Sequence, residues 1–149
     1  IKIVLTNFLP ATDDVELWMR LSTNGGSSYD AGVADYGWGN TVSSAGGGTG
    51  TQNDASDSEI VVAGGTAGGQ GVGNGAAEAA SAVVYLFGQT STAQWPRVMY
   101  DSVWTAATLD HFRTAGIGVR LAAQDTDAVR FLFESGNITS GTYAVYGLV

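Results

Sequence analysis

Apolar and polar residues alternate along several short segments of this chain, and a period of two is typical of half-buried β-strands. In the segment 15–22, VELWMRLS, every second residue is apolar, and Trp18 falls on the opposite face. The segment 97–105, RVMYDSVWT, alternates in the same way. Since successive side chains of a strand point to opposite faces, each segment is expected to bury one face. Trp18 is therefore expected to be exposed, or covered by a neighbouring sheet, subunit or ligand.

The C-terminal stretch 129–149, VRFLFESGNITSGTYAVYGLV, holds two alternating runs with glycine-containing breaks between them. This pattern predicts two strands joined as a closing hairpin. Gly136 and Gly141 punctuate the break, and we expect both to take positive φ angles in the turn, which glycine adopts without steric cost. An Asn-Gly-Gly sequence that ends in Gly25 and Gly26 predicts another tight turn between strands.

The same reasoning predicts further strands, with little helix between them. They are expected at 1–8, 29–38, 58–63, 81–87 and 117–123. Only 76–80 has a helix-forming composition, and 108–116 fits either a short helix or a loop. Eight or nine short strands without a repeat of fixed period predict one all-β domain over residues 1–149, an antiparallel β-sandwich of jelly-roll type.

Residues 39–75 differ from the rest of the chain. Thirteen of the 22 glycines lie between Gly37 and Gly75, and Ser, Thr, Asn and Asp fill much of the remainder. This composition predicts a long loop-dominated region at one end of the sandwich, interrupted by the strand near 58–63. Long loops of this kind are often functional or mobile.

Charge and composition exclude several classes of function. The net charge is −8, Lys2 is the only lysine, and no cysteine is present. A nucleic-acid-binding face needs clustered Lys and Arg, and an anionic membrane surface would repel this chain, so neither partner is expected. Disulfides and thiolate metal sites are excluded by the absence of cysteine.

The residues offer little for catalysis. The single histidine, His111, lies next to Asp110, and the sequence leaves open a serine that meets this pair in space. No G-x-S-x-G motif occurs, and a surface or loop-packing histidine is favoured. Acidic pairs such as Asp13 and Asp14 fall in predicted turns, where Asp caps the backbone. Residues 71–76 fit G-x-G-x-x-A, but no strand leads into them, so neither a cofactor nor enzymatic activity is expected.

Four aspartates are weak candidates for a calcium site, because hard cations prefer clustered oxygen ligands. Asp54 with Asp57, and Asp125 with Asp127, give such oxygens at short spacing. Neither pair matches a complete calcium-loop signature, so turn capping is favoured and no bound metal is expected.

Three aromatic residues are candidates for a binding surface. Trp18, Tyr36 and Trp38 could stack on a sugar ring or become buried in an interface. A sandwich of this size also needs aromatic side chains for its core, and for Tyr36 and Trp38 the core role is favoured. Trp18 is the exception, because it lies opposite an apolar face.

Two segments resemble a known group of proteins. LTNFLPATDDVELWMRLSTNGGSSYDAGVADYGW at 5–38 has a Pro-Ala-Thr-Asp turn and a Gly-Gly-Ser turn, and FLFESGNITSGTYAVYGL at 131–148 contains Ser-Gly-Asn-x-x-Ser-Gly-Thr before a strand with Tyr-Gly. In these features the chain resembles small bacteriophage virion structural proteins. The two segments cover a little over a third of the chain, at both ends. The shared residues are turn and strand-end residues, so they report architecture better than activity.

The resemblance implies a jelly-roll virion component without catalytic residues. It implies a capsid decoration or a tail-fibre or spike domain, located in the virion, that serves particle assembly or host attachment. Other virion proteins and copies of itself are the implied partners, a trimer being one such homo-oligomer, and a host-surface glycan is a further candidate. The alternative hypothesis from the residues is a lectin-like carbohydrate-binding module.

Overall fold

The computed structural model describes residues 1–65 and 70–147, and within them the protein is all-β. In chain order the strands are β1 (Lys2–Pro10), β2 (Leu17–Ser22), β3 (Tyr36–Ser44), β4 (Thr49–Asp57), β5 (Ile60–Ala63), β6 (Ala80–Phe87), β7 (Arg97–Thr105), β8 (His111–Arg120), β9 (Ala128–Phe133) and β10 (Ile138–Tyr146). Ten strands in these residues exceed the eight or nine predicted. None of the described residues belongs to a helix long and apolar enough to cross a membrane.

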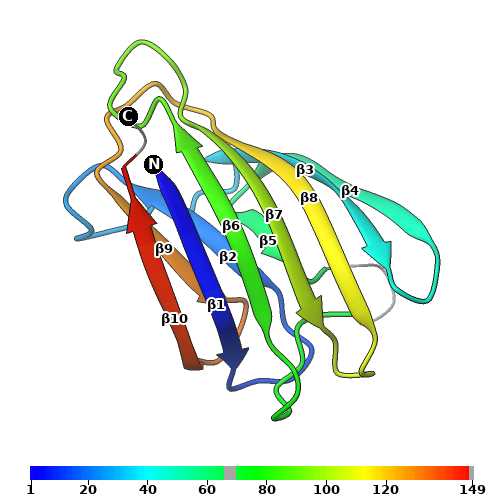
Figure 1. The fold of residues 1–149 in the computed structure, drawn as a ribbon. Coiled ribbons are helices and arrows are strands. Elements are labelled where there is room, and N and C mark those ends of the chain that lie inside the picture. The colour runs from blue at the N-terminus through cyan, green and yellow to red at the C-terminus, as the bar shows by residue number, and fades with distance from the viewer. Residues whose placement is uncertain (66–69, 148–149) are drawn as a thin grey trace.

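The strands form two antiparallel sheets that face each other (Figure 1). The large sheet has seven strands in the order β10-β1-β6-β7-β8-β3-β4, and the small sheet has three in the order β5-β2-β9. In the view of Figure 1 the small sheet lies behind the large one. The predicted all-β antiparallel sandwich is therefore confirmed.

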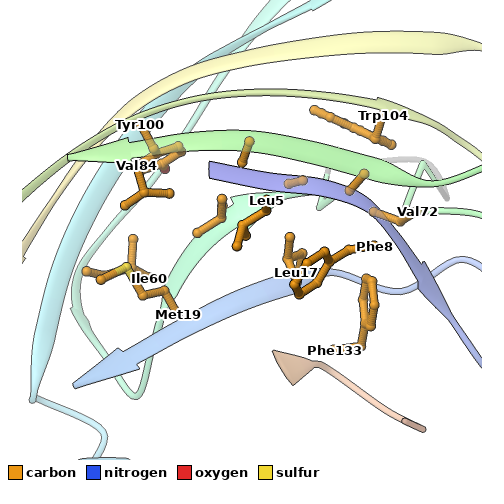
Figure 2. Packing of buried hydrophobic residues seen from close by; sticks show 14 of the residues in the cluster. Leu5, Phe8, Leu17, Met19, Ile60, Val72, Val84, Tyr100, Trp104 and Phe133 are labelled. Atoms are coloured by element: carbon orange, nitrogen blue, oxygen red, sulfur yellow. The ribbon is translucent and has the colours of Figure 1, made fainter. Parts of the chain in front are cut away.

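The core lies between the two sheets and follows from the alternation in the sequence. On β2, Leu17, Met19 and Leu21 are fully buried, whereas Trp18 and Arg20 between them are partly exposed. On β7, Val98, Tyr100, Ser102 and Trp104 are buried and the residues between them are exposed, as the alternation predicts. Figure 2 shows side chains of both sheets meeting in this layer.

Two side chains of the large sheet also hydrogen-bond to the backbone of the small one. The hydroxyl of Tyr36 on β3 accepts a bond of 2.7 Å from the N–H of Leu21 on β2. The hydroxyl of Ser102 on β7 donates a bond of 2.6 Å to the carbonyl of Val62 on β5. Because all four residues are buried, these bonds link the sheets where water does not compete.

The two C-terminal strands do not form the predicted hairpin. β9 pairs with β2 in the small sheet, whereas β10 pairs with β1 in the large sheet. The chain therefore passes from one sheet to the other between Phe133 and Ile138. Alternation identified both strands correctly, but it fixes which face is buried and not which strand lies alongside. Residues 148–149 of the predicted hairpin lie outside the described residues.

The prediction of a loop-dominated region at 39–75 is wrong. This stretch contains most of β3, all of β4, which pairs with β3, and β5, which confirms the strand predicted near 58–63. β4 is an end strand whose side chains are almost all exposed, so small and polar residues meet no packing requirement there. Residues 66–69 of the stretch lie outside the described residues.

Three smaller predictions also need correction. The segment 29–38, expected as an irregular strand, is a strand only from Tyr36, where β3 begins. The segment 108–116 is neither helix nor loop throughout, because β8 begins at His111. The short segment 76–80 forms a turn that leads into β6, and no helix.

The turn glycines have the predicted backbone geometry, with one difference of place. Gly25, Gly26, Gly136 and Gly141 have φ angles of 70, 80, 74 and 150°. Gly141 lies within β10 and not in the turn, opposite an irregularity in β1 where the register shifts. A Cβ atom added to Gly141 would lie 2.7 Å from Cδ2 of the buried Phe8. Both the backbone angle and the core packing therefore require glycine at this position.

Gly141→Val is expected to lower the free energy of unfolding by about 2–5 kcal/mol, because it combines an unfavourable φ with overpacking against Phe8. Gly50→Val is the matched control, since an added Cβ at Gly50 on β4 meets nothing within 4 Å. Urea unfolding of both variants measures the difference. Equal stability of the two would contradict this account of Gly141.

Stability should also decline at alkaline pH. Burial raises the pKa of Tyr36 and of Tyr100 to about 12, from 10.0. Between these values the unfolded chain releases both protons while the folded chain keeps them, so the free energy of unfolding falls as pH rises through this window. Urea titrations at about pH 8 and about pH 11 measure the decline. Tyr100→Phe should make it smaller, whereas Tyr143→Phe, at an exposed ring, should not.

Candidate binding face

The outer face of the large sheet, which points away from the small sheet, is hollowed into an open trough of roughly 1000 Å³. We call this hollow the outer trough. It spans β1, β6, β7, β8 and β3, which are neighbours in the sheet. The outward-facing residues that line it are Lys2, Val4, Thr6, Gly39, Thr41, Ser81, Val83, Tyr85, Met99, Asp101, Val103, Ala115 and Ile117.

Strand register brings apolar side chains into rows across the trough. Met99 on β7 lies directly opposite Tyr85 on β6 and Ile117 on β8. Ile117 in turn faces Gly39 on β3, which has no side chain to cover it. Ile117, Val103 and Met99 are 67, 52 and 48% exposed. Several large apolar side chains on neighbouring strands thus remain in contact with water.

Charged groups are sparse in the trough. Arg113 on β8 donates from Nε to Asp101 Oδ1 on β7 over 2.9 Å, and a second guanidinium nitrogen pairs with the other carboxylate oxygen. The pair is exposed, and such pairs contribute little to stability. At the β1 end, the Nζ atom of Lys2 lies 6.0 Å from the ring centre of Tyr85 and 5.8 Å from that of Tyr146. The trough therefore combines an apolar floor with one lysine and one aspartate, whose ion-pair partner Arg113 is not among the lining residues.

The predicted binding residue Trp18 lies elsewhere, on the outer face of the small sheet. Its Nε1 donates a bond of 2.7 Å to Glu16, and the guanidinium of Arg20 lies 5.5 Å from its ring centre. Arg20 also pairs with Glu59 at 2.8 Å and donates to the carbonyl of Ser58. Burial raises the pKa of the Glu16 carboxyl. The ring of Trp18 is thus partly covered by side chains of its own chain.

The other two predicted aromatics do not join Trp18. Tyr36 is fully buried, so the hypothesis that its ring offers a binding surface is wrong. Trp38 on β3 packs against the core and donates from Nε1 to Asp57 over 2.9 Å. Alternation alone did not separate these positions, because the start of β3 was not apparent from the sequence. The three aromatics therefore belong to different parts of the fold and form no common site.

Three of the four aspartates considered for calcium cap backbone groups. Asp54 accepts from the N–H of Ser56, and Asp57 from the N–H of Ser58. Asp127 accepts from the N–H of Gly25, so it ties the turn after β2 to the segment before β9. Asp125 is exposed. In residues 1–65 and 70–147, no three His, Cys, Asp or Glu side chains gather as metal ligands would.

The single histidine has a local partner. His111 Nδ1 lies 3.1 Å from the hydroxyl of Thr105 on the paired strand β7, and the histidine is exposed. Asp110 accepts from Thr108, its neighbour in the turn before β8. Gly71, which opens the G-x-G-x-x-A match, donates its N–H to Asp14. These residues serve turns and strand ends.

No protein family, curated protein or solved structure matches this chain. The outer trough was not identified from the sequence. The alternation of 97–105 did place Met99 and Val103 on the face opposite the core. Their meeting with Ile117 and Tyr85 depends on strand register, which one strand's pattern does not contain.

Arg20→Ala is expected to destabilise the fold by about 2–4 kcal/mol, because it leaves the buried carboxylate of Glu59 without its cation. Arg113→Ala, which breaks the exposed pair with Asp101, is the control and should change stability little. Urea unfolding of both variants tests whether the residues around Trp18 are structural. A larger loss for Arg113→Ala would contradict that interpretation.

Proposed function

We propose that this chain is a non-enzymatic structural module of a bacteriophage particle, a capsid decoration or a jelly-roll domain of a tail fibre or spike. The observation that carries the proposal is the exposed apolar floor of the outer trough. Exposed apolar patches on sheet faces mark interaction surfaces, because burying them gains free energy. Covering one Ile, Val or Met side chain contributes about 1.5–3 kcal/mol.

Two further features support an assembly role. The residues that line the trough are apolar, small or hydroxyl-bearing, with a single aspartate and a single lysine, and such a surface favours contact with another protein. The turn and strand-end residues at 5–38 and 131–148 resemble those of phage virion proteins. The trough supports a role in binding another protein, and the resemblance supports a phage virion as the place of that contact.

Ile117→Lys should reduce incorporation into particles at least about ten-fold, because it places a charge on the apolar floor and costs more than about 1.4 kcal/mol of contact. Val33→Lys is the matched control, since Val33 is an exposed apolar residue outside the trough. Quantitative mass spectrometry of purified particles from the encoding phage measures both. Absence of the wild-type chain from particles would overturn the proposed function.

A lectin-like module is the second candidate, and Tyr85 favours it. This ring lines the trough together with Lys2, Asp101 and several hydroxyls, and sugar sites combine an aromatic face with a few polar groups. A glycan array distinguishes the candidates. Binding that Tyr85→Ala abolishes would support the lectin, and an array without hits would remove it.

A further inference from the structure

One end of the large sheet is an open strand edge. β10 is the last strand in the order and pairs with β1 alone, so its other side presents unpaired backbone N–H and C=O groups. Natural proteins protect such edges with charged residues, proline, short length or β-bulges. The register shifts of the β1–β10 pairing lie between Ile138 and Thr142, so the run from Thr142 to Tyr146 is regular. β10 spans nine residues, ITSGTYAVY, and contains no charged residue and no proline.

The other outermost strands of the two sheets are protected in these ways. β4, at the opposite end of the large sheet, carries Asp54 and Asp57 and no large apolar side chain. In the small sheet, β9 carries Arg130 and β5 has only four residues. β10 is thus the one long and uncharged sheet edge among the described strands.

The large exposed side chains of β10 are apolar or aromatic. Tyr143 pairs with Leu5 and Val145 with Ile3, so both point toward the inner face of the large sheet, yet they are 73 and 57% exposed. Leu5 and Ile3 on the adjacent strand are buried. The small sheet therefore covers β1 but leaves the inner side of β10 uncovered.

We propose that β10 pairs antiparallel with β10 of a second copy of this chain, about a two-fold axis, so that the two large sheets become continuous. The self-complementary backbone of this edge argues for the occupant, and charge argues for the place. Two copies with a net charge of −8 repel each other, and an uncharged edge of donors and acceptors is the contact that is self-complementary under a two-fold axis.

Full overlap of Ile138–Tyr146 with itself sets the register. The axis then passes at Thr142, and Ile138 lies opposite Tyr146 of the second copy. Tyr143 lies opposite Gly141 of the second copy, whose missing side chain leaves room for the ring. Ile138, Tyr143 and Tyr146 are 39, 73 and 52% exposed in the single chain, so the pairing removes apolar surface at the centre and at both ends.

The biological role of this contact rests on the proposed assembly function, whereas the contact itself is a property of the purified chain. A chain without cysteine allows a direct test of the register. Thr142→Cys places two thiols across the axis at a Cα separation of about 4.5–5.5 Å, within the range that a disulfide spans. We expect covalent dimers under mild oxidation.

Two matched controls should form no covalent dimer under the same conditions. Ser140→Cys lies opposite Ala144 of the second copy, so its thiol has no partner. Thr51→Cys lies on β4, at the protected edge. Tyr143 is exposed in the single chain, so Tyr143→Lys should leave the fold intact. It should raise the dimer dissociation constant, measured by sedimentation equilibrium, at least about ten-fold.

The outcomes separate the two proposals. A wild-type chain that sediments as a monomer at its highest soluble concentration overturns the pairing, and so does equal cross-linking of Thr142→Cys and either control. A monomer that is nevertheless found in particles leaves the proposed function standing. A purified chain that dimerises but is absent from particles supports the pairing and overturns the proposed function.

Discussion

The structure depends on covering one face of a wide sheet with a much narrower one. Three strands pack against seven, and the buried stripe of Leu17, Met19 and Leu21 on β2 meets the inner face of the large sheet. The hydroxyls of Tyr36 and Ser102 fix the small sheet in place by bonding to its backbone. A cover of this width leaves part of the inner face and the whole outer face of the large sheet to water.

That mismatch explains why the inner side of β10 is exposed, and the absence of a further layer explains the exposed apolar residues of the outer face. The outer trough lies on the face that no further layer covers, and β10 is an end strand whose inner side stays exposed. Both surfaces lie on the large sheet, one on its face and one at its edge, so their use by partners is geometrically compatible. A module with a face contact and an edge contact can join two kinds of neighbour within an assembly.

Local patterns predicted the strands well and their partners poorly. The burial of 97–105 followed from alternation alone, because this strand has one face in the core and one in solvent. The closing hairpin failed because β9 and β10, though adjacent in sequence, each find a better partner in a different sheet. The glycine-rich β3–β4 hairpin was missed because small and polar residues were interpreted as a loop. Such residues also suit an end strand, whose side chains pack against little. The trough depends on the register of strands far apart in sequence, which no single segment encodes.

The pairing of β1 with β10 has a consequence for how the chain folds. Lys2 lies opposite Tyr146, so strands from nearly the two ends of the described sequence must meet before the large sheet is complete. Contacts between residues so distant carry a high loop-closure entropy, and proteins rich in them fold slowly. During synthesis, β1 would wait with an exposed edge until residues 138–146 leave the ribosome. Of the ten described strands, the one that covers the edge of β1 is therefore the last to be synthesised.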